Sequence, residues 1–212
     1  MQKLYYQFPG TWFGDCMPFG HGDKFYLYHQ RDTRKPGPFG EPFGWDLATT
    51  KDFVTYEDCG VAIPRGTDEE QDQFIFAGSI CEDREGKYHA FYTGYCLTAE
   101  YQQTICHATS EDGITWTKDA ANPVITPMIE LYEKLDWRDP YVFYNEEDKC
   151  YWILISARRL DMPVTRRGCI VLYRSKDLVN WEILSYALTD ETKFDIKGMD
   201  TACGIWAPNL TY

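Results

Sequence analysis

A seven-residue pattern occurs three times in this chain at nearly constant spacing. Each copy reads as a small hydroxyl residue, a charged residue, Asp, two turn residues, a polar residue and an aromatic residue. The three aspartates, Asp52, Asp112 and Asp177, lie 60 and then 65 residues apart. An Asp carboxylate accepts hydrogen bonds from backbone amides within a turn, so each copy predicts a β-hairpin. Three hairpins at one period predict a repeated supersecondary unit.

The segments between the copies are typical of β-strands. Short aromatic or aliphatic runs at 24–29, 87–93 and 150–156 each follow a stretch rich in turn residues. Long helical periodicity is lacking, although residues 128–135 could form about two helical turns. Each unit therefore reads as four strands, which is the composition of a β-propeller blade.

The fold class expected from this repeat is all-β, a partial β-propeller forming a single domain over residues 1–212. Three complete blades leave exposed sheet edges and do not close a ring, so we expect a fragment of a longer chain. The predicted blades are approximately 5–64, 65–127 and 128–190, with the start of a fourth at 191–212.

The charge and the cysteines restrict the partners and the compartment. A formal net charge of −12 opposes binding to nucleic acid or to an anionic membrane surface. Eight scattered cysteines form no Cys-x-x-Cys pair, and the N-terminus lacks the apolar core of a signal peptide. We therefore expect reduced thiols, a cytoplasmic location and no membrane span. We also expect no cofactor and no metal. The alternative for the acidic loop 67–72 is that it supplies oxygen ligands to calcium instead of being solvated.

The residues that open each unit are the candidates for chemistry, because inner strands of a propeller begin at its central funnel. Units one and three each place an aspartate there, Asp15 and Asp139, and we expect the two to occupy equivalent places. Two carboxylates facing one funnel suit glycoside cleavage, where one attacks the anomeric carbon or activates water and another shapes the charge of the transition state. Arg138 would keep Asp139 ionised and orient it. The alternative is that both aspartates are caps of turns or strand ends.

Four motifs in this order resemble glycoside hydrolase family 32 over residues 5–183. Trp12–Pro18 is similar to the family's Trp-Met-Asn-Asp-Pro-Asn-Gly, 24–30 to Tyr-His-Leu-Phe-Tyr-Gln, Phe76–Ser79 to Phe-Ser-Gly-Ser, and 138–140 to Arg-Asp-Pro. The resemblance implies a five-bladed propeller that hydrolyses an oligosaccharide or small glycoside, with Asp15 as nucleophile and Asp139 as transition-state stabiliser. Further candidates for substrate binding are Gln30, Gln73, Ser79 and Arg138, together with Trp206 in the C-terminal segment. Trp12 and Trp45 could stack on sugar or belong to the core.

The sequence departs from that family at two places. Gly14 and Cys16 replace the Asn and Pro that flank the nucleophile, and 204–209 has no carboxylic acid where the family carries its acid/base Glu. Residues 175–212 resemble xylosidases of glycoside hydrolase family 43 more closely. Three interpretations therefore remain: a retaining family 32-type glycosidase, an inverting family 43-type enzyme in which Asp15 activates water, and a sugar-binding fragment without catalysis.

Overall fold

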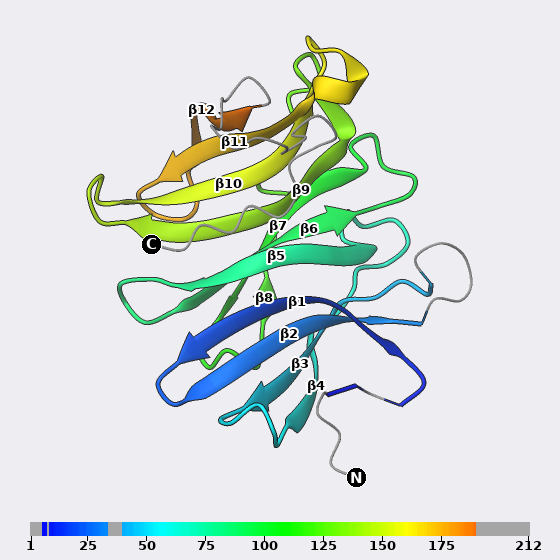
Figure 1. Ribbon diagram of the computed structural model, residues 1–212, viewed down its shortest axis with the longest axis vertical. Helices are drawn as coiled ribbons and strands as arrows, with labels where there is room; N and C mark the ends of the chain where they lie inside the picture. The colour runs from blue at the N-terminus through cyan, green and yellow to red at the C-terminus, as the bar shows by residue number, and fades with distance from the viewer. Residues whose placement is uncertain (1–5, 8, 34–39, 190–212) are drawn as a thin grey trace, which may run out of the picture.

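The computed structural model describes residues 6–7, 9–33 and 40–189, which form three four-stranded antiparallel sheets stacked one on another (Figure 1). In each sheet the strand order follows the chain, as in a propeller blade. Blade 1 contains β1 (Trp12–His21), β2 (Lys24–Asp32), β3 (Trp45–Thr50) and β4 (Glu57–Ile63). Blade 2 contains β5 (Phe74–Glu82), β6 (Tyr88–Tyr95), β7 (Gln103–Ser110) and β8 (Thr117–Lys118). Blade 3 contains β9 (Tyr132–Asn145), β10 (Cys150–Arg159), β11 (Gly168–Ser175) and β12 (Glu182–Thr189).

The repeated pattern forms the turn between the third and fourth strands of every blade. Asp52 Oδ1 accepts hydrogen bonds from the amides of residues 54 and 55, both at 2.8 Å. Asp112 and Asp177 accept from the equivalent amides at 2.7–3.0 Å. The residue after each Asp has a positive φ between 55° and 69°, although only the second copy uses glycine there. The prediction of an all-β chain with three blades is confirmed, and the predicted start of a fourth blade lies outside the described residues.

Two apolar layers join the blades. One lies between blades 1 and 2 and is built around Trp45, Leu47, Ile75 and Tyr92. The other joins blades 2 and 3 and contains Phe91, Trp137 and Ile153, with further apolar side chains around them. Burial of these large side chains holds β5 against β1 on one side and against β9 on the other.

The prediction that residues 128–135 could form two helical turns is wrong. Met128 O accepts hydrogen bonds from the amides of Leu131 and Tyr132, each at 2.9 Å, which makes a single turn. Strand β9 then begins at Tyr132, because its residues pair with β10. The helical residues that the structure describes are a 3₁₀ turn at Val164–Arg166, and no described helix is long and apolar enough to cross a membrane.

Candidate active site

The inner strands of the three blades line a common groove of about 760 Å³. Its walls come from residues 15–20 of β1, 77–81 of β5 and 139–143 of β9. Asp15 and Asp139 therefore line one groove, and Ser79 stands on the strand between theirs.

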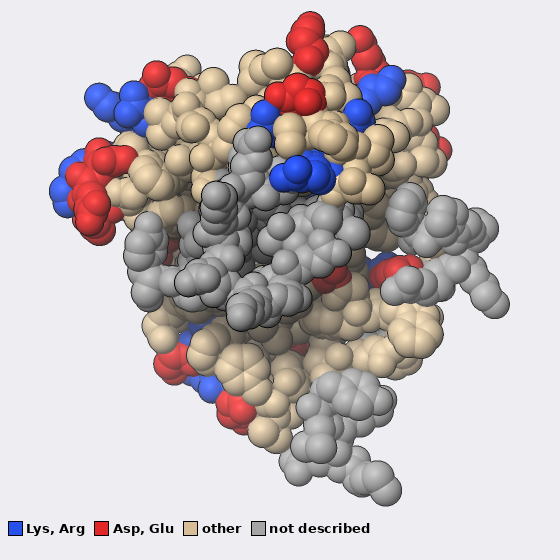
Figure 2. Space-filling view, turned by 45° about the horizontal axis from the view of Figure 1, so that its top comes forward, with Lys and Arg blue, Asp and Glu red and all other residues tan. Residues whose placement is uncertain are grey.

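On the face shown in Figure 2, acidic and basic side chains are interspersed, and its described residues present no continuous basic surface.

Each inner strand contains a β-bulge, where two of its residues face one residue of the second strand. Residues 14 and 15 face Gln30 in blade 1, residues 76 and 77 face Thr93 in blade 2, and residues 139 and 140 face Ile155 in blade 3. A bulge re-aims side chains and interrupts the regular alternation of a strand. All three blades therefore present irregular backbone to the groove.

The bulges correct one expectation about the two aspartates. Asp15 is the second residue of its bulge, whereas Asp139 is the first, so their places are offset by one residue instead of equivalent. The structural counterpart of Asp15 in blade 3 is Pro140. Both carboxylates still line the groove, because alternation of side chains is broken within a bulge.

Gln30 holds Asp15 in its exposed position on β1. The Asp15 amide donates to Gln30 Oε1 at 3.4 Å, and Gln30 Nε2 donates to Asp15 Oδ2 at the same distance. The Gln30 side chain lies over Gly14, where a Cβ atom would stand 2.8 Å from Oε1. Glycine at 14 thus leaves the space that lets a buried glutamine amide contact the backbone and the carboxylate of Asp15.

Asp139 has an unusual backbone conformation, with φ of 55° in a residue that precedes proline. The left-handed region is disfavoured for residues with a Cβ atom, and the surrounding structure must stabilise it. Its amide donates a 2.8 Å hydrogen bond to Thr93 Oγ1. Its carboxylate lies 4.0 Å from Nε of Arg138, whose side chain is largely buried.

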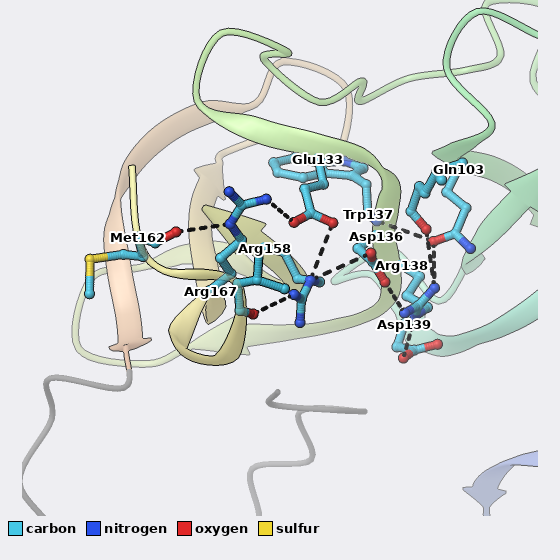
Figure 3. A network of polar contacts seen from close by, with 11 residues as sticks. Gln103, Glu133, Asp136, Trp137, Arg138, Asp139, Arg158, Met162 and Arg167 are labelled. Carbon is cyan, nitrogen blue, oxygen red and sulfur yellow. Dashed lines mark hydrogen bonds and ion pairs between the residues drawn. The ribbon is translucent and has the colours of Figure 1, made fainter. Parts of the chain in front are cut away.

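Arg138 belongs to a chain of alternating charges that ends at the groove (Figure 3). Its guanidinium pairs with Asp136 and donates to Gln103 Oε1 at 2.9 Å. Beyond Asp136 the chain continues, with Arg158 Nε 3.7 Å from Asp136 Oδ2 and 3.3 Å from Glu133 Oε2. Arg167 Nη1 completes it, 2.7 Å from Glu133 Oε1.

Glu133 is held ionised in this chain. Burial raises the pKa of its carboxyl, but hydrogen bonds from Arg167 and the charge of Arg158 outweigh burial, so the pKa lies below its ordinary value. Arg158 and Arg167 therefore share an ionised partner, and Arg138 is held by its contacts with Asp136 and Gln103. This fixed orientation lets the Arg138 guanidinium present one face to Asp139.

Three predicted sugar-binding residues lie outside the set that lines the groove. Trp45 is fully buried between the blades, and its indole nitrogen donates to Phe76 O at 2.9 Å, so its ring belongs to the core. Gln73 is buried, and its Oε1 accepts from the Leu97 amide at 3.1 Å. Trp12 is 58% exposed and lines a separate hollow of about 400 Å³ with Tyr6 and Tyr56. Trp206 lies outside the described residues.

The remaining predicted residues have defined contacts at or beside the groove. Ser79 lines the groove, and its hydroxyl accepts a 2.9 Å hydrogen bond from the Val142 amide of blade 3. Sequence reasoning missed Thr93 and Gln103, which contact the segment around Asp139. No local pattern marks them, because their partners lie 34 to 46 residues away.

The described residues give no cluster of three or more side chains that could hold a metal ion. In the acidic loop considered for calcium, Asp68 pairs with Arg65 at 2.8 Å and Glu70 accepts from the Thr67 amide at 2.6 Å. Asp72 pairs with Lys118 at 2.5 Å. These three carboxylates thus make contacts within the protein.

Comparison with known proteins identifies the family. The profile described as glycosyl hydrolases family 32 N-terminal domain matches residues 9–203. The chain belongs to glycosyl hydrolase family 32. A levanase of Bacillus subtilis is 34% identical over 175 residues, covering 76% of this chain and 22% of the levanase. An extracellular exo-inulinase of Meyerozyma guilliermondii is 31% identical, covering 76% of this chain and 30% of the inulinase.

Solved structures of family 32 proteins share the fold. The exo-inulinase from Aspergillus awamori superposes with a TM-score of 0.69 at 26% identity, over 86% of this chain and 38% of the inulinase. A fructofuranosidase from Schwanniomyces occidentalis, solved with fructose, gives a TM-score of 0.68 at 26% identity, over 86% of this chain and 35% of that protein. The chain thus spans about a fifth to two fifths of the length of these relatives.

The family 32 match changes one expectation about the C-terminal segment. It extends to residue 203, into the segment for which we expected a resemblance to family 43. That resemblance receives no support from the match, and most of the segment lies outside the described residues.

Proposed function

We propose that this chain supplies one side of the active-site groove of a β-fructosidase, an enzyme that hydrolyses the glycosidic bond of a terminal fructosyl unit. The observation that carries the proposal is that Asp15 and Asp139 line one groove at the inner edge of the blades. The family supports a fructosyl substrate, since relatives at 30–34% identity are a levanase and exo-inulinases. The net charge of −12 is compatible with a neutral sugar.

Asp15 has the role of nucleophile in this proposal. It is exposed to the groove, and the Gln30 amide holds its carboxylate toward solvent. Attack of one carboxylate oxygen on the anomeric carbon breaks the bond to the leaving oxygen and forms a fructosyl–enzyme ester. Water then displaces Asp15 at the same carbon, so two inversions retain the configuration.

Asp139 has the role of stabilising the positive charge that develops on the sugar and of accepting hydrogen bonds from its hydroxyl groups. Arg138, at 4.0 Å, favours the ionised form that both tasks require. The proton for the leaving oxygen comes from a third group, which we assign to neither aspartate. Among the described lining residues of the groove, the acidic side chains are these two aspartates.

This last observation favours a second candidate function, binding of a fructosyl sugar without cleavage. General acid catalysis typically contributes about 10²–10⁴-fold, so a groove without a donor would bind sugar and turn over slowly. The same two aspartates would then contact hydroxyl groups only. The two candidates share the groove and differ in turnover.

The test is release of fructose from sucrose, inulin and levan by the purified protein, together with fructose binding measured by calorimetry. We expect Asp15→Asn to abolish release while leaving the thermal unfolding midpoint unchanged. Asp23→Asn is the matched control, because Asp23 lies in the exposed turn between β1 and β2 and pairs with Lys51. Undiminished release by Asp15→Asn would refute the proposed role. Fructose binding that depends on both aspartates, without release from any substrate, would establish the second candidate.

A further inference from the structure

Two buried polar side chains of blade 2 contact the backbone on which Asp139 stands. Thr93 of β6 is fully buried and faces the bulge of its own blade. Gln103 of β7 is 6% exposed and pairs with Tyr95, two residues beyond Thr93 on β6. Neither belongs to the residues lining the groove.

The Thr93 hydroxyl joins three strands. It donates its proton to Ala77 O of β5 at 2.9 Å, and it accepts the Asp139 amide of β9 at 2.8 Å. A hydroxyl has one proton, so these two contacts define its orientation completely. Ala77 and Asp139 both belong to bulges that line the groove. Thr93 therefore couples the bulge of blade 2 to the bulge of blade 3.

Gln103 holds the residues immediately before Asp139. Its Oε1 accepts the Trp137 amide at 3.2 Å and Arg138 Nη1 at 2.9 Å (Figure 3). One atom thus fixes both the backbone and the guanidinium that faces the Asp139 carboxylate. On the other side of Asp139, Ser79 accepts the Val142 amide, so blade 2 holds this segment at three points.

We propose that Thr93 and Gln103 are positioning residues for Asp139. Thr93 stabilises the left-handed backbone conformation of Asp139, with φ of 55°, and Gln103 sets the direction from which Arg138 faces its carboxylate. A strained backbone conformation persists only where surrounding contacts stabilise it, and the hydrogen bonds of these two side chains provide such contacts. The meaning of this arrangement for sugar binding rests on the proposed function.

Blade 1 contains a parallel to this arrangement. Gln30 occupies in blade 1 the place that Thr93 occupies in blade 2, opposite the bulge of the inner strand. Gln30 contacts Asp15 within its own blade, whereas Thr93 reaches across to Asp139 of the next blade. The residue opposite the bulge thus holds one groove carboxylate in each case, by two different routes.

The test compares Thr93→Val, which keeps the shape and removes the hydroxyl, with Thr93→Ser, which restores the hydroxyl. The control is Thr104→Val, because Thr104 is also fully buried and its hydroxyl makes only a 4.0 Å contact with Cys106 Sγ. Gln103→Met is paired with Gln102→Met, since Gln102 Nε2 donates to Leu97 O of its own loop at 3.1 Å. For all five variants the readouts are the hydrogen-exchange rate of the Asp139 amide, the ¹³C shift of its carboxyl group, and fructose affinity.

We expect Thr93→Val to speed exchange of the Asp139 amide about tenfold and to weaken fructose binding about tenfold, because a buried amide loses its acceptor. Thr93→Ser restores both values, and Gln103→Met moves the carboxyl shift and weakens binding. Both controls leave all readouts near wild type. Unchanged exchange, carboxyl shift and affinity in Thr93→Val and Gln103→Met would overturn the inference. If the wild-type protein binds no fructose, the proposed function fails, while exchange and carboxyl shift still decide whether these residues position Asp139.

Discussion

Replacing Gly78 with alanine is expected to destabilise this protein strongly, because the backbone of the neighbouring strand occupies the place of a methyl group. A Cβ atom at 78 would lie 2.1 Å from Phe91 O and 2.7 Å from Tyr92 Cα. Both atoms belong to the backbone of β6, so no rotamer change can relieve the contact. Favourable contacts between carbon atoms begin near 3.5 Å, so β5 and β6 would have to separate by about 1 Å.

The size of the effect follows from what that separation disturbs. Overpacking a close-packed interior typically costs about 1–3 kcal/mol. Gly78 pairs with Tyr92 directly beside the bulge at residues 76–77, so separation also strains the ladder there. We therefore expect the upper end of that range, about 3 kcal/mol. For a domain of this size, this loss corresponds to a melting temperature lower by roughly 6–12 °C.

The assay is urea denaturation and thermal melting, with Gly20→Ala as the matched control. Gly20 lines the same groove, but a Cβ atom added there would have the Phe25 ring as its nearest neighbour, at 3.7 Å, which is ordinary contact. The control is expected to change stability by no more than about 0.5 kcal/mol. Equal unfolding midpoints for the two variants would show that β5 and β6 adjust freely, and the reasoning about Gly78 would fail.

Two further predictions concern charge. The Asp52 carboxylate accepts hydrogen bonds from the backbone amides of Thr55 and Val54, which lower its pKa to about 2. The stabilisation by this carboxylate is complete above about pH 4, the ordinary pKa of Asp, and is lost as pH falls toward 2. Asp52→Asn should therefore reduce the drop in the urea unfolding midpoint between about pH 5 and 2.5. An unaltered drop would contradict this prediction. Arg138→Lys cannot reproduce a planar fork and should weaken fructose binding about tenfold in calorimetry with little change in melting temperature, whereas wild-type affinity would argue against the role of the guanidinium.

The fold could be predicted from the sequence because its signal is local. The aspartate of each repeated pattern accepts hydrogen bonds from amides two and three residues further along, as seen for Asp52, Asp112 and Asp177. The donors and acceptors of each turn therefore lie within seven residues. Recurrence of this pattern at a period near sixty then predicts the blade. The turn at 128–132 could not be predicted because its signal is not local. Pairing of β9 with β10 determines its conformation, and no nearby residue indicates that pairing.

The site could be predicted only in part. Asp15 and Asp139 are recognisable because they open repeated units, and both line the groove. Trp45 and Gln73 are buried away from the groove, which the sequence does not reveal because their burial depends on contacts with distant strands. The one-residue offset between the two aspartates arises from the bulges, which a strictly alternating strand pattern does not reveal.

The β-bulges of the three inner strands bring residues of three blades to one groove. Their backbone is also tied to the sheets, since Phe76 O accepts from Trp45 and Ala77 O from Thr93. The two bulge residues differ between the blades: they are Gly-Asp in blade 1, Phe-Ala in blade 2 and Asp-Pro in blade 3. A change in what the groove accepts would therefore begin with these bulge residues and the side chain opposite each pair, Gln30, Thr93 or Ile155.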